Sequence, residues 1–178
     1  MDMSQGGTTS FNGLLHPSKF PQTTTTSDGC CTASLTYHPI SSDDALRETR
    51  CPAAGANVMF LGTTRDYFGA RKVSRLSYSA YPALALKSLL SIAMAARSQF
   101  GLEKVYIQHR LGTVDVEQES IAVAVSAGHR APAWKGAEEV LEKCKEKAEI
   151  WKLEQFEGQG NDGEWRANEK STSTDTIR

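Results

Sequence analysis

The chain has 178 residues, of which 39% are hydrophobic and 23% are charged, values that fit one globular domain with terminal tails. Twenty lysines and arginines face twenty-one aspartates and glutamates, which gives a formal net charge of −1. This balance argues against a protein that binds nucleic acid by neutralising many phosphates, so any anion site must be local. No apolar run reaches the roughly 18 residues that span a bilayer, and we expect a soluble, cytosolic protein without membrane contact.

The four cysteines, at positions 30, 31, 51 and 144, form no C-x-x-C pair. Neither a zinc site nor a disulfide framework is indicated, and reduced thiols are expected. His129 has no second ligand at metal-binding spacing, and His109 is 20 residues away on another predicted strand. We therefore predict no metal and no cofactor.

Composition divides the chain into three parts. Residues 1–31 are rich in threonine, serine and glycine and have no apolar periodicity, which predicts a disordered N-terminal tail. Residues 32–165 form the predicted domain, in which a glycine-rich loop at 158–163 precedes Trp165. Residues 166–178 are predicted to be a flexible C-terminal tail.

In the first half of the domain, alternation predicts strands over 33–38 and 75–80, and a continuous apolar run predicts a strand over 58–61 buried on both faces. Helices are predicted over 43–50 and 83–100. Ser41 and Asp44 have capping-box spacing before the first helix, and Gly101 ends the second.

In the second half, strands over 105–110 and 121–126 are predicted to form a hairpin, the second strand being buried on both sides. A helix is expected to begin around Pro132. Its predicted inner stripe consists of Trp134, Ala137, Leu141, Cys144 and Ala148.

Cationic side chains gather at three predicted element ends. Arg65 lies in a polar loop between two glycines after a strand, where it could present its planar fork to an anion. His129 and Arg130 fall at a helix N-terminus, where free N–H groups favour anions. In isolation, each residue could also be an ordinary loop or capping residue.

Lys145 and Lys152 lie seven residues apart around Trp151, a residue that can pack. They share a face if the helix continues, whereas Lys152 points away from Trp151 if the backbone extends at Ile150. Lysines at a helix C-terminus often only complement the helix dipole. The local pattern therefore leaves both a charged helix end and an anion site open.

The sequence has no G-x-S-x-G, P-loop, G-x-G-x-x-G or H-E-x-x-H motif. Five other segments, in their order and spacing, resemble the large catalytic subunit of molybdopterin synthase. They are Phe60-Leu61-Gly62-Thr63-Thr64-Arg65, Tyr78-Ser79-Ala80-Tyr81, Gln108-His109-Arg110-Leu111-Gly112, Ala127-Gly128-His129-Arg130 and Ile150-Trp151-Lys152-Leu153-Glu154.

The resemblance implies an α+β fold with a hammerhead-like arrangement and a mainly antiparallel sheet. It also implies a homodimer that binds a small ubiquitin-like subunit on each protomer, giving a heterotetramer. The small subunit carries sulfur as a C-terminal thiocarboxylate. Two sulfur transfers convert cyclic pyranopterin monophosphate into the dithiolene of molybdopterin, a step of molybdenum cofactor biosynthesis that uses no metal.

The resemblance assigns substrate binding to five cations: Arg65, His129, Arg130, Lys145 and Lys152. Arg65, His129 and Arg130 suit the phosphate and pterin, and the lysines suit the sulfur-transfer end. Lys145 and Lys152 are the catalytic candidates. In a partly dry pocket an amine releases its proton more readily, so Lys145 could act as general acid or base, and Lys152 would assist electrostatically.

Glu149 departs from the family pattern, which usually has proline before the aliphatic-Trp-Lys segment. A carboxylate there could pair with a lysine and keep it protonated. That pairing would allow one alternative function, a non-catalytic module that binds the ubiquitin-like partner. A second alternative, a sensor of a phosphorylated small ligand that has no partner, needs only the cation cluster.

Overall fold

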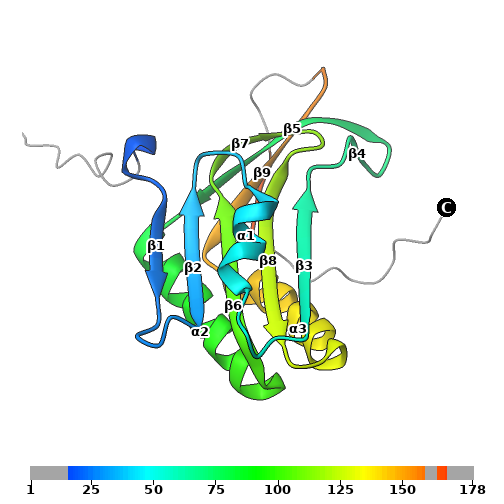
Figure 1. Cartoon of the computed structure of the whole chain (residues 1–178). Coiled ribbons are helices and arrows are strands. Elements are labelled where there is room, and N and C mark those ends of the chain that lie inside the picture. Colours follow the sequence, from blue (N-terminus) through cyan, green and yellow to red (C-terminus); the bar gives the residue numbers. More distant parts are fainter. Residues whose placement is uncertain (1–15, 159–163, 168–178) are drawn as a thin grey trace, which may run out of the picture.

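The computed structural model describes residues 16–158 and 164–167 (Figure 1). Two sheets make up its β structure. The first has the strand order β1-β2-β6-β8-β3 and the second β10-β9-β5-β4, with β7 also paired to β5. The strands are β1 Gln22–Thr25, β2 Cys31–Thr36, β3 Ala56–Thr63, β4 Tyr67–Phe68, β5 Arg71–Ala80, β6 Leu102–Arg110, β7 Gly112–Asp115, β8 Glu119–Ala127, β9 Ile150–Phe156 and β10 Glu164–Ala167.

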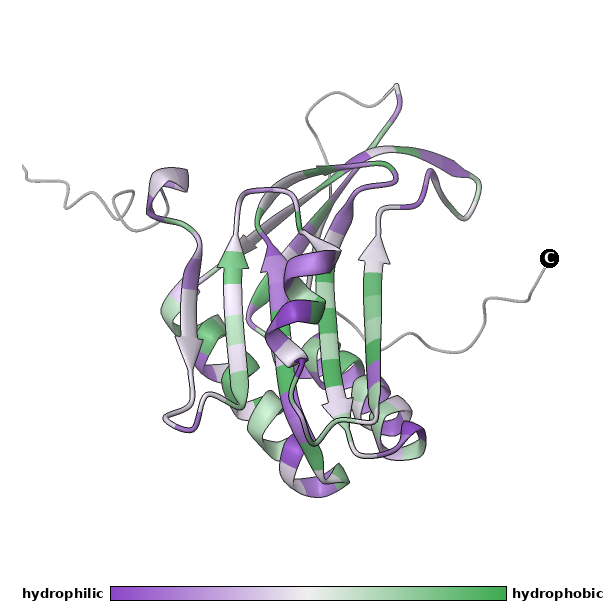
Figure 2. Cartoon of the chain, viewed as in Figure 1, coloured by the Kyte–Doolittle hydropathy of each residue, from purple (hydrophilic) through white to green (hydrophobic). Residues whose placement is uncertain are grey.

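All strand pairs are antiparallel except β2 with β6. Two long helices, α2 (Pro82–Phe100) and α3 (Arg130–Lys147), cover one face of the first sheet, and α1 (Ser42–Thr49) covers the other (Figure 1). In Figure 2 most of β3 and β8 is hydrophobic, whereas α1 is largely hydrophilic. The α+β class and the mainly antiparallel pairing are confirmed.

The helix ends follow the predicted signals. The Ser41 hydroxyl accepts a hydrogen bond from the Asp44 amide at 3.2 Å and so caps α1. Pro82 opens α2, and Gly101 ends it in the left-handed conformation with φ of 63°. These contacts are local, which is why sequence spacing alone located both helices.

Gly112 is the point where the chain passes from the first sheet to the second. Its φ is 75°, and an added Cβ would lie 2.9 Å from the Tyr37 ring, so a side chain there would meet both backbone strain and a clash. The strand that follows, β7, pairs with β5. The sequence reading treated this segment as part of a polar connection and missed β7.

The prediction that residues 1–31 are disordered is wrong for the second half of this segment. Strand β1 pairs with β2 over Gln22–Thr25, and Phe20 is buried in the main core. Backbone pairing between strands needs no apolar face, and threonine is favoured in strands. The prediction of disorder, which rested on the lack of apolar residues, therefore missed this edge strand. Residues 1–15 lie outside the described part of the chain.

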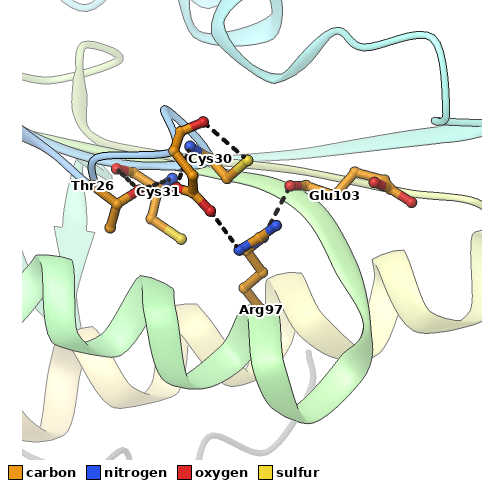
Figure 3. A network of polar contacts seen from close by, with 6 residues as sticks. Thr26, Cys30, Cys31, Arg97 and Glu103 are labelled. Atoms are coloured by element: carbon orange, nitrogen blue, oxygen red, sulfur yellow. Dashed lines mark hydrogen bonds and ion pairs between the residues drawn. The ribbon is translucent and has the colours of Figure 1, made fainter.

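A polar network joins the β1–β2 turn to α2 (Figure 3). Arg97 pairs with Asp28 at 3.0 Å and donates from Nε to the Glu103 carbonyl at 3.1 Å. Hydrogen bonds from the Thr26 hydroxyl and the Cys30 amide, with the Arg97 charge, lower the pKa of Asp28 to about 2. The β1–β2 turn is therefore linked to α2 through the Arg97–Asp28 ion pair.

At the C-terminal end, residues 166 and 167 belong to β10 and pair with β9, so the predicted flexible tail begins too early. Residues 168–178, and 159–163 of the glycine-rich loop, lie outside the described part.

Two burial predictions are also wrong. Strand β3 lies at a sheet edge, and Phe60 keeps 38% of its surface exposed, so β3 is not covered on both faces. Trp134 is 64% exposed on α3. The buried residues of that helix are Ala133, Gly136, Ala137, Val140 and Cys144. Small residues on this face let the helix approach the sheet, and Gly136 is in contact range of Leu102, where a Cβ would lie 2.8 Å from its side chain.

Deleting residues 1–27 should lower the free energy of unfolding by about 3 kcal/mol, because the deletion removes β1 and the buried Phe20 ring. Urea unfolding of the two proteins measures this. A deletion of 1–15 is the matched control, since it leaves Phe20 and β1 in place. Equal midpoints for all three proteins would show that β1 contributes nothing to stability.

Candidate functional site

Lys145 and Lys152 line one cavity of about 200 Å³. Lys145 comes from the last turn of α3 and Lys152 from β9. Its other walls include Phe60, Gly62 and Thr63 of β3, Tyr78 of β5, His109 of β6, and Ser120 and Ile121 of β8. The two catalytic candidates therefore meet at the junction of both sheets with the end of α3.

The helix does not continue through the two lysines. It ends at Lys147, Ala148 is its C-cap, and the chain extends from Ile150 as β9. Ile150 is 2% exposed and Trp151 is 41% exposed, so the isoleucine, and not the tryptophan, anchors the segment. Of the two geometries left open by the sequence, the extended one is present.

Each lysine has a carboxylate partner. Lys145 Nζ lies 3.0 Å from Glu142 Oε1, and Lys152 Nζ lies 2.8 Å from Glu154 Oε1. Lys145 retains 40% side-chain exposure, so it is less dry than the sequence interpretation supposed. Glu154 is buried, and its Oε2 has no hydrogen-bond partner within the described residues. The Lys152 pair is thus the more enclosed and the more rigidly placed.

Glu149 does not pair with either lysine. Its Oε1 accepts a hydrogen bond from the Ser88 hydroxyl of α2 at 3.1 Å. The expectation that Glu149 could hold a lysine protonated through an ion pair is therefore wrong. The carboxylate instead ties the turn between α3 and β9 to α2.

His109 is a pocket residue that the sequence interpretation did not assign. It is buried, its Nδ1–H donates to the Arg110 carbonyl at 2.8 Å, and its ring meets Tyr78 edge-on at 4.9 Å. Burial lowers the pKa of His109 to about 4, although the hydrogen bond to Arg110 opposes this. The imidazole is therefore neutral near pH 7. Its place in the quoted Gln108-His109-Arg110 segment, on an alternating strand, was the available signal.

Cys144 also lines the cavity, on the turn of α3 that carries Lys145. Burial raises the pKa of its thiol to about 12. A thiolate is the nucleophilic form of cysteine, so Cys144 is a packing residue here.

The other three predicted site residues lie apart from the cavity. Thr63 lines it, whereas Arg65, two residues later, is exposed and is not among the lining residues. His129 is the N-cap of α3 and Arg130 its first residue. Sixteen residues of helix separate His129 from Lys145, about 24 Å at 1.5 Å per residue. One chain therefore brings Lys145 and Lys152 together, with Arg65 two residues beyond the cavity wall and His129 and Arg130 at the far end of α3.

The fold and the cavity define a class: an α+β protein with a small cavity that is lined by two carboxylate-paired lysines. Among the described residues there is no cluster of three or more side chains that could hold a metal ion. No helix in the described part of the chain is long and apolar enough to cross a membrane.

The chain belongs to the MoaE protein family, whose model matches residues 35–147. It is 54% identical over 163 residues to the molybdopterin synthase catalytic subunit of Aspergillus fumigatus, a match that covers 92% of this chain and 86% of that protein. The corresponding Aspergillus niger subunit is 58% identical over 136 residues, covering 76% and 74%. The resemblance seen in the sequence is confirmed.

Solved structures give the same result. The molybdopterin synthase of Staphylococcus aureus superposes with a TM-score of 0.69 at 28% identity, covering 74% of this chain and 94% of that one. A Helicobacter pylori protein in a complex of subunits 1 and 2 of molybdopterin-converting factor superposes with a TM-score of 0.60 at 22% identity, covering 71% and 86%, and supports the fold alone.

Acid should destabilise the protein through His109. Its pKa is about 4 when folded and 6.5 when unfolded, so the unfolded state binds the proton first as pH falls. The stabilisation from keeping His109 neutral is fully present above pH 6.5, and the free energy of unfolding falls by about 3 kcal/mol between pH 6.5 and pH 4. Urea unfolding of wild type and His109→Gln across this range measures it. Identical pH dependence in the two proteins would contradict the assignment.

Proposed function

We propose that this chain is the catalytic subunit of a molybdopterin synthase and that the Lys145–Lys152 cavity is its sulfur-transfer site. The observation that carries the proposal is that two lysines from different elements, α3 and β9, converge on one cavity. The names of the curated relatives support the activity. The proposed substrate is cyclic pyranopterin monophosphate, the proposed product is the molybdopterin dithiolene, and the proposed location is the cytosol.

The two lysines suit different parts of a sulfur transfer. Lys152 is held by the buried Glu154, so it offers a fixed positive charge to an anion. Lys145 is more exposed and its partner Glu142 lies on the helix surface, so its ammonium group can leave that pair and reach the reacting atoms. Lys145 would then move a proton or polarise the thiocarboxylate carbonyl as charge develops.

The sulfur donor is proposed to be a small ubiquitin-like subunit with a C-terminal thiocarboxylate. The curated relatives at 54% and 58% identity are named catalytic subunits, a name that implies a further subunit. The cavity is small, about 200 Å³, so it suits the end of an extended tail better than a folded surface. Gly62 in its wall packs against Ile121, whose Cγ2 would lie 2.7 Å from an added Cβ, so a side chain at this position would disturb the wall.

His129 and Arg130 are proposed to serve the pocket of a second copy of this chain. They cannot reach Lys145 of their own chain, because α3 holds them about 24 Å away. Within the described residues neither side chain has a hydrogen bond or ion pair, so both are available. Exposed Trp134 on the same helix and Phe60 on the β3 edge supply apolar surface for such a dimer, which with two small subunits would form a heterotetramer.

One of the two competing functions loses its main support, and the other can be tested. A non-catalytic partner-binding module was favoured by a possible Glu149–lysine pair, and Glu149 bonds Ser88 instead. A phosphate sensor without a partner would need only the cations. It predicts no affinity for a ubiquitin-like tail, which a binding measurement with the small subunit can test.

Lys145→Ala should lower turnover roughly 100-fold while the small subunit still binds. The assay is dithiolene formation from cyclic pyranopterin monophosphate with the thiocarboxylated small subunit. Lys145→Arg should rescue little, because arginine stays protonated, whereas Lys152→Arg should retain more activity. Lys147→Ala, from the same helix end, is the matched control and should change stability by a few tenths of a kcal/mol only. Full turnover by Lys145→Ala would remove Lys145 from the mechanism.

Mixing two inactive variants tests the shared pocket. Lys145→Ala subunits refolded with Arg130→Ala subunits should regain about a quarter of wild-type turnover, because half of the dimers are mixed and each has one intact pocket. A mixture of Lys145→Ala with Lys152→Ala is the control. Both of these lesions lie in the pocket of one chain, so no dimer contains an intact site. Equal, negligible activity of the two mixtures would contradict a pocket that is shared between copies.

A further inference from the structure

The Arg65 loop is fixed at the residue before Arg65. The Thr64 amide donates to the Gln118 carbonyl at 3.0 Å, and the Thr64 carbonyl accepts from the Glu117 amide at 2.9 Å. The Thr64 hydroxyl donates to the Val114 carbonyl at 3.5 Å, and Thr64 is 2% exposed. Arg65 is exposed beside this buried residue, so its backbone position depends on the 115–118 turn.

That turn is itself strained. The Gln118 amide donates to the Asp115 carbonyl at 3.1 Å, and Glu117 between them has φ of 70°. Among the described residues Glu117 is the one non-glycine residue in the left-handed region. A residue with a Cβ keeps such a conformation only where its surroundings hold it there.

The side chain of Arg110 contacts this turn through Gln118. It lies at the end of β6, is 9% exposed, and donates from Nη1 to Gln118 Oε1 at 2.8 Å. Its Nε is buried without a partner, and no ion pair with a carboxylate forms within the described residues. A buried cation without a counter-charge costs stability. Arg110 is therefore poorly explained by stability alone.

We propose that Arg110 and Gln118 are positioning residues for Arg65, acting through the 115–118 turn and Thr64. The inference rests on the proposed function, with Arg65 binding the substrate phosphate as the family resemblance implies. An arginine whose backbone is already fixed loses less conformational freedom when its guanidinium binds an anion. The Arg110–Gln118 hydrogen bond should therefore strengthen substrate binding. Neither Arg110 nor Gln118 touches the cavity, so the chemical step should be unaffected.

The test is a double-mutant cycle in the reconstituted reaction with thiocarboxylated small subunit and cyclic pyranopterin monophosphate. Gln118→Leu removes the acceptor for Arg110 and should raise KM for the substrate roughly 5- to 20-fold, with kcat within about twofold of wild type. Gln118→Glu keeps an acceptor and supplies a counter-charge, so its KM should stay close to wild type. In the Arg65→Ala background, Gln118→Leu should change KM by less than about twofold.

Arg110→Lys is the second variant, which keeps a charge but moves the donor, and it should raise KM without adding to Gln118→Leu. If Gln118→Leu does not fold, Arg110→Lys completes the same cycle. Equal effects of Gln118→Leu with and without Arg65, or an unchanged KM, would overturn the positioning role. If Arg65→Ala alone leaves KM unchanged, Arg65 does not bind the substrate. That result is distinct from a failure of the positioning role of Arg110 and Gln118, in which Arg65→Ala raises KM and Gln118→Leu does not.

Discussion

The pocket depends on the place where α3 stops and β9 begins. The Ala148 amide still bonds the Cys144 carbonyl at 3.0 Å, and two residues later Ile150 enters the sheet, 2% exposed. Strand β9 then pairs with β5 so that Lys152 lies opposite Tyr78. Because side chains alternate along a strand, a shift of one residue would turn Lys152 away from the cavity. Burial of Ile150 against the core sets that register, and the Glu149–Ser88 hydrogen bond supports the turn.

The charges of the cavity are arranged in pairs around neutral groups. Two lysines face two carboxylates, one on the exposed surface of α3 and one in the sheet. His109 and Cys144 between them are uncharged near neutral pH, since burial lowers the pKa of the first and raises that of the second. The local field therefore comes from the lysine pairs, and an arriving anion competes with Glu142 and Glu154 for the same cations.

Sequence reasoning located what depends on neighbours in the chain. The Ser41 cap, Pro82 and Gly101 each act within a few residues, so α1 and α2 were predicted closely. It failed where distant partners decide. Strand β1 exists because β2 is beside it, Phe60 is exposed because β3 is an edge, and His109 became a pocket residue because β9 and α3 meet above it. The five cations came from the family resemblance, and the helix predicted from about Pro132 to Ala148 already placed His129 and Arg130 at the opposite end from Lys145.

The burial of Cys144 determines how its thiol reacts with a sulfur donor in the same cavity. A thiolate beside a thiocarboxylate could attack its carbonyl carbon, which would form a thioester and release sulfide. With the pKa of its thiol at about 12, Cys144 holds almost no thiolate under cellular conditions. Burial of Cys144 therefore suppresses this side reaction in the proposed sulfur-transfer pocket.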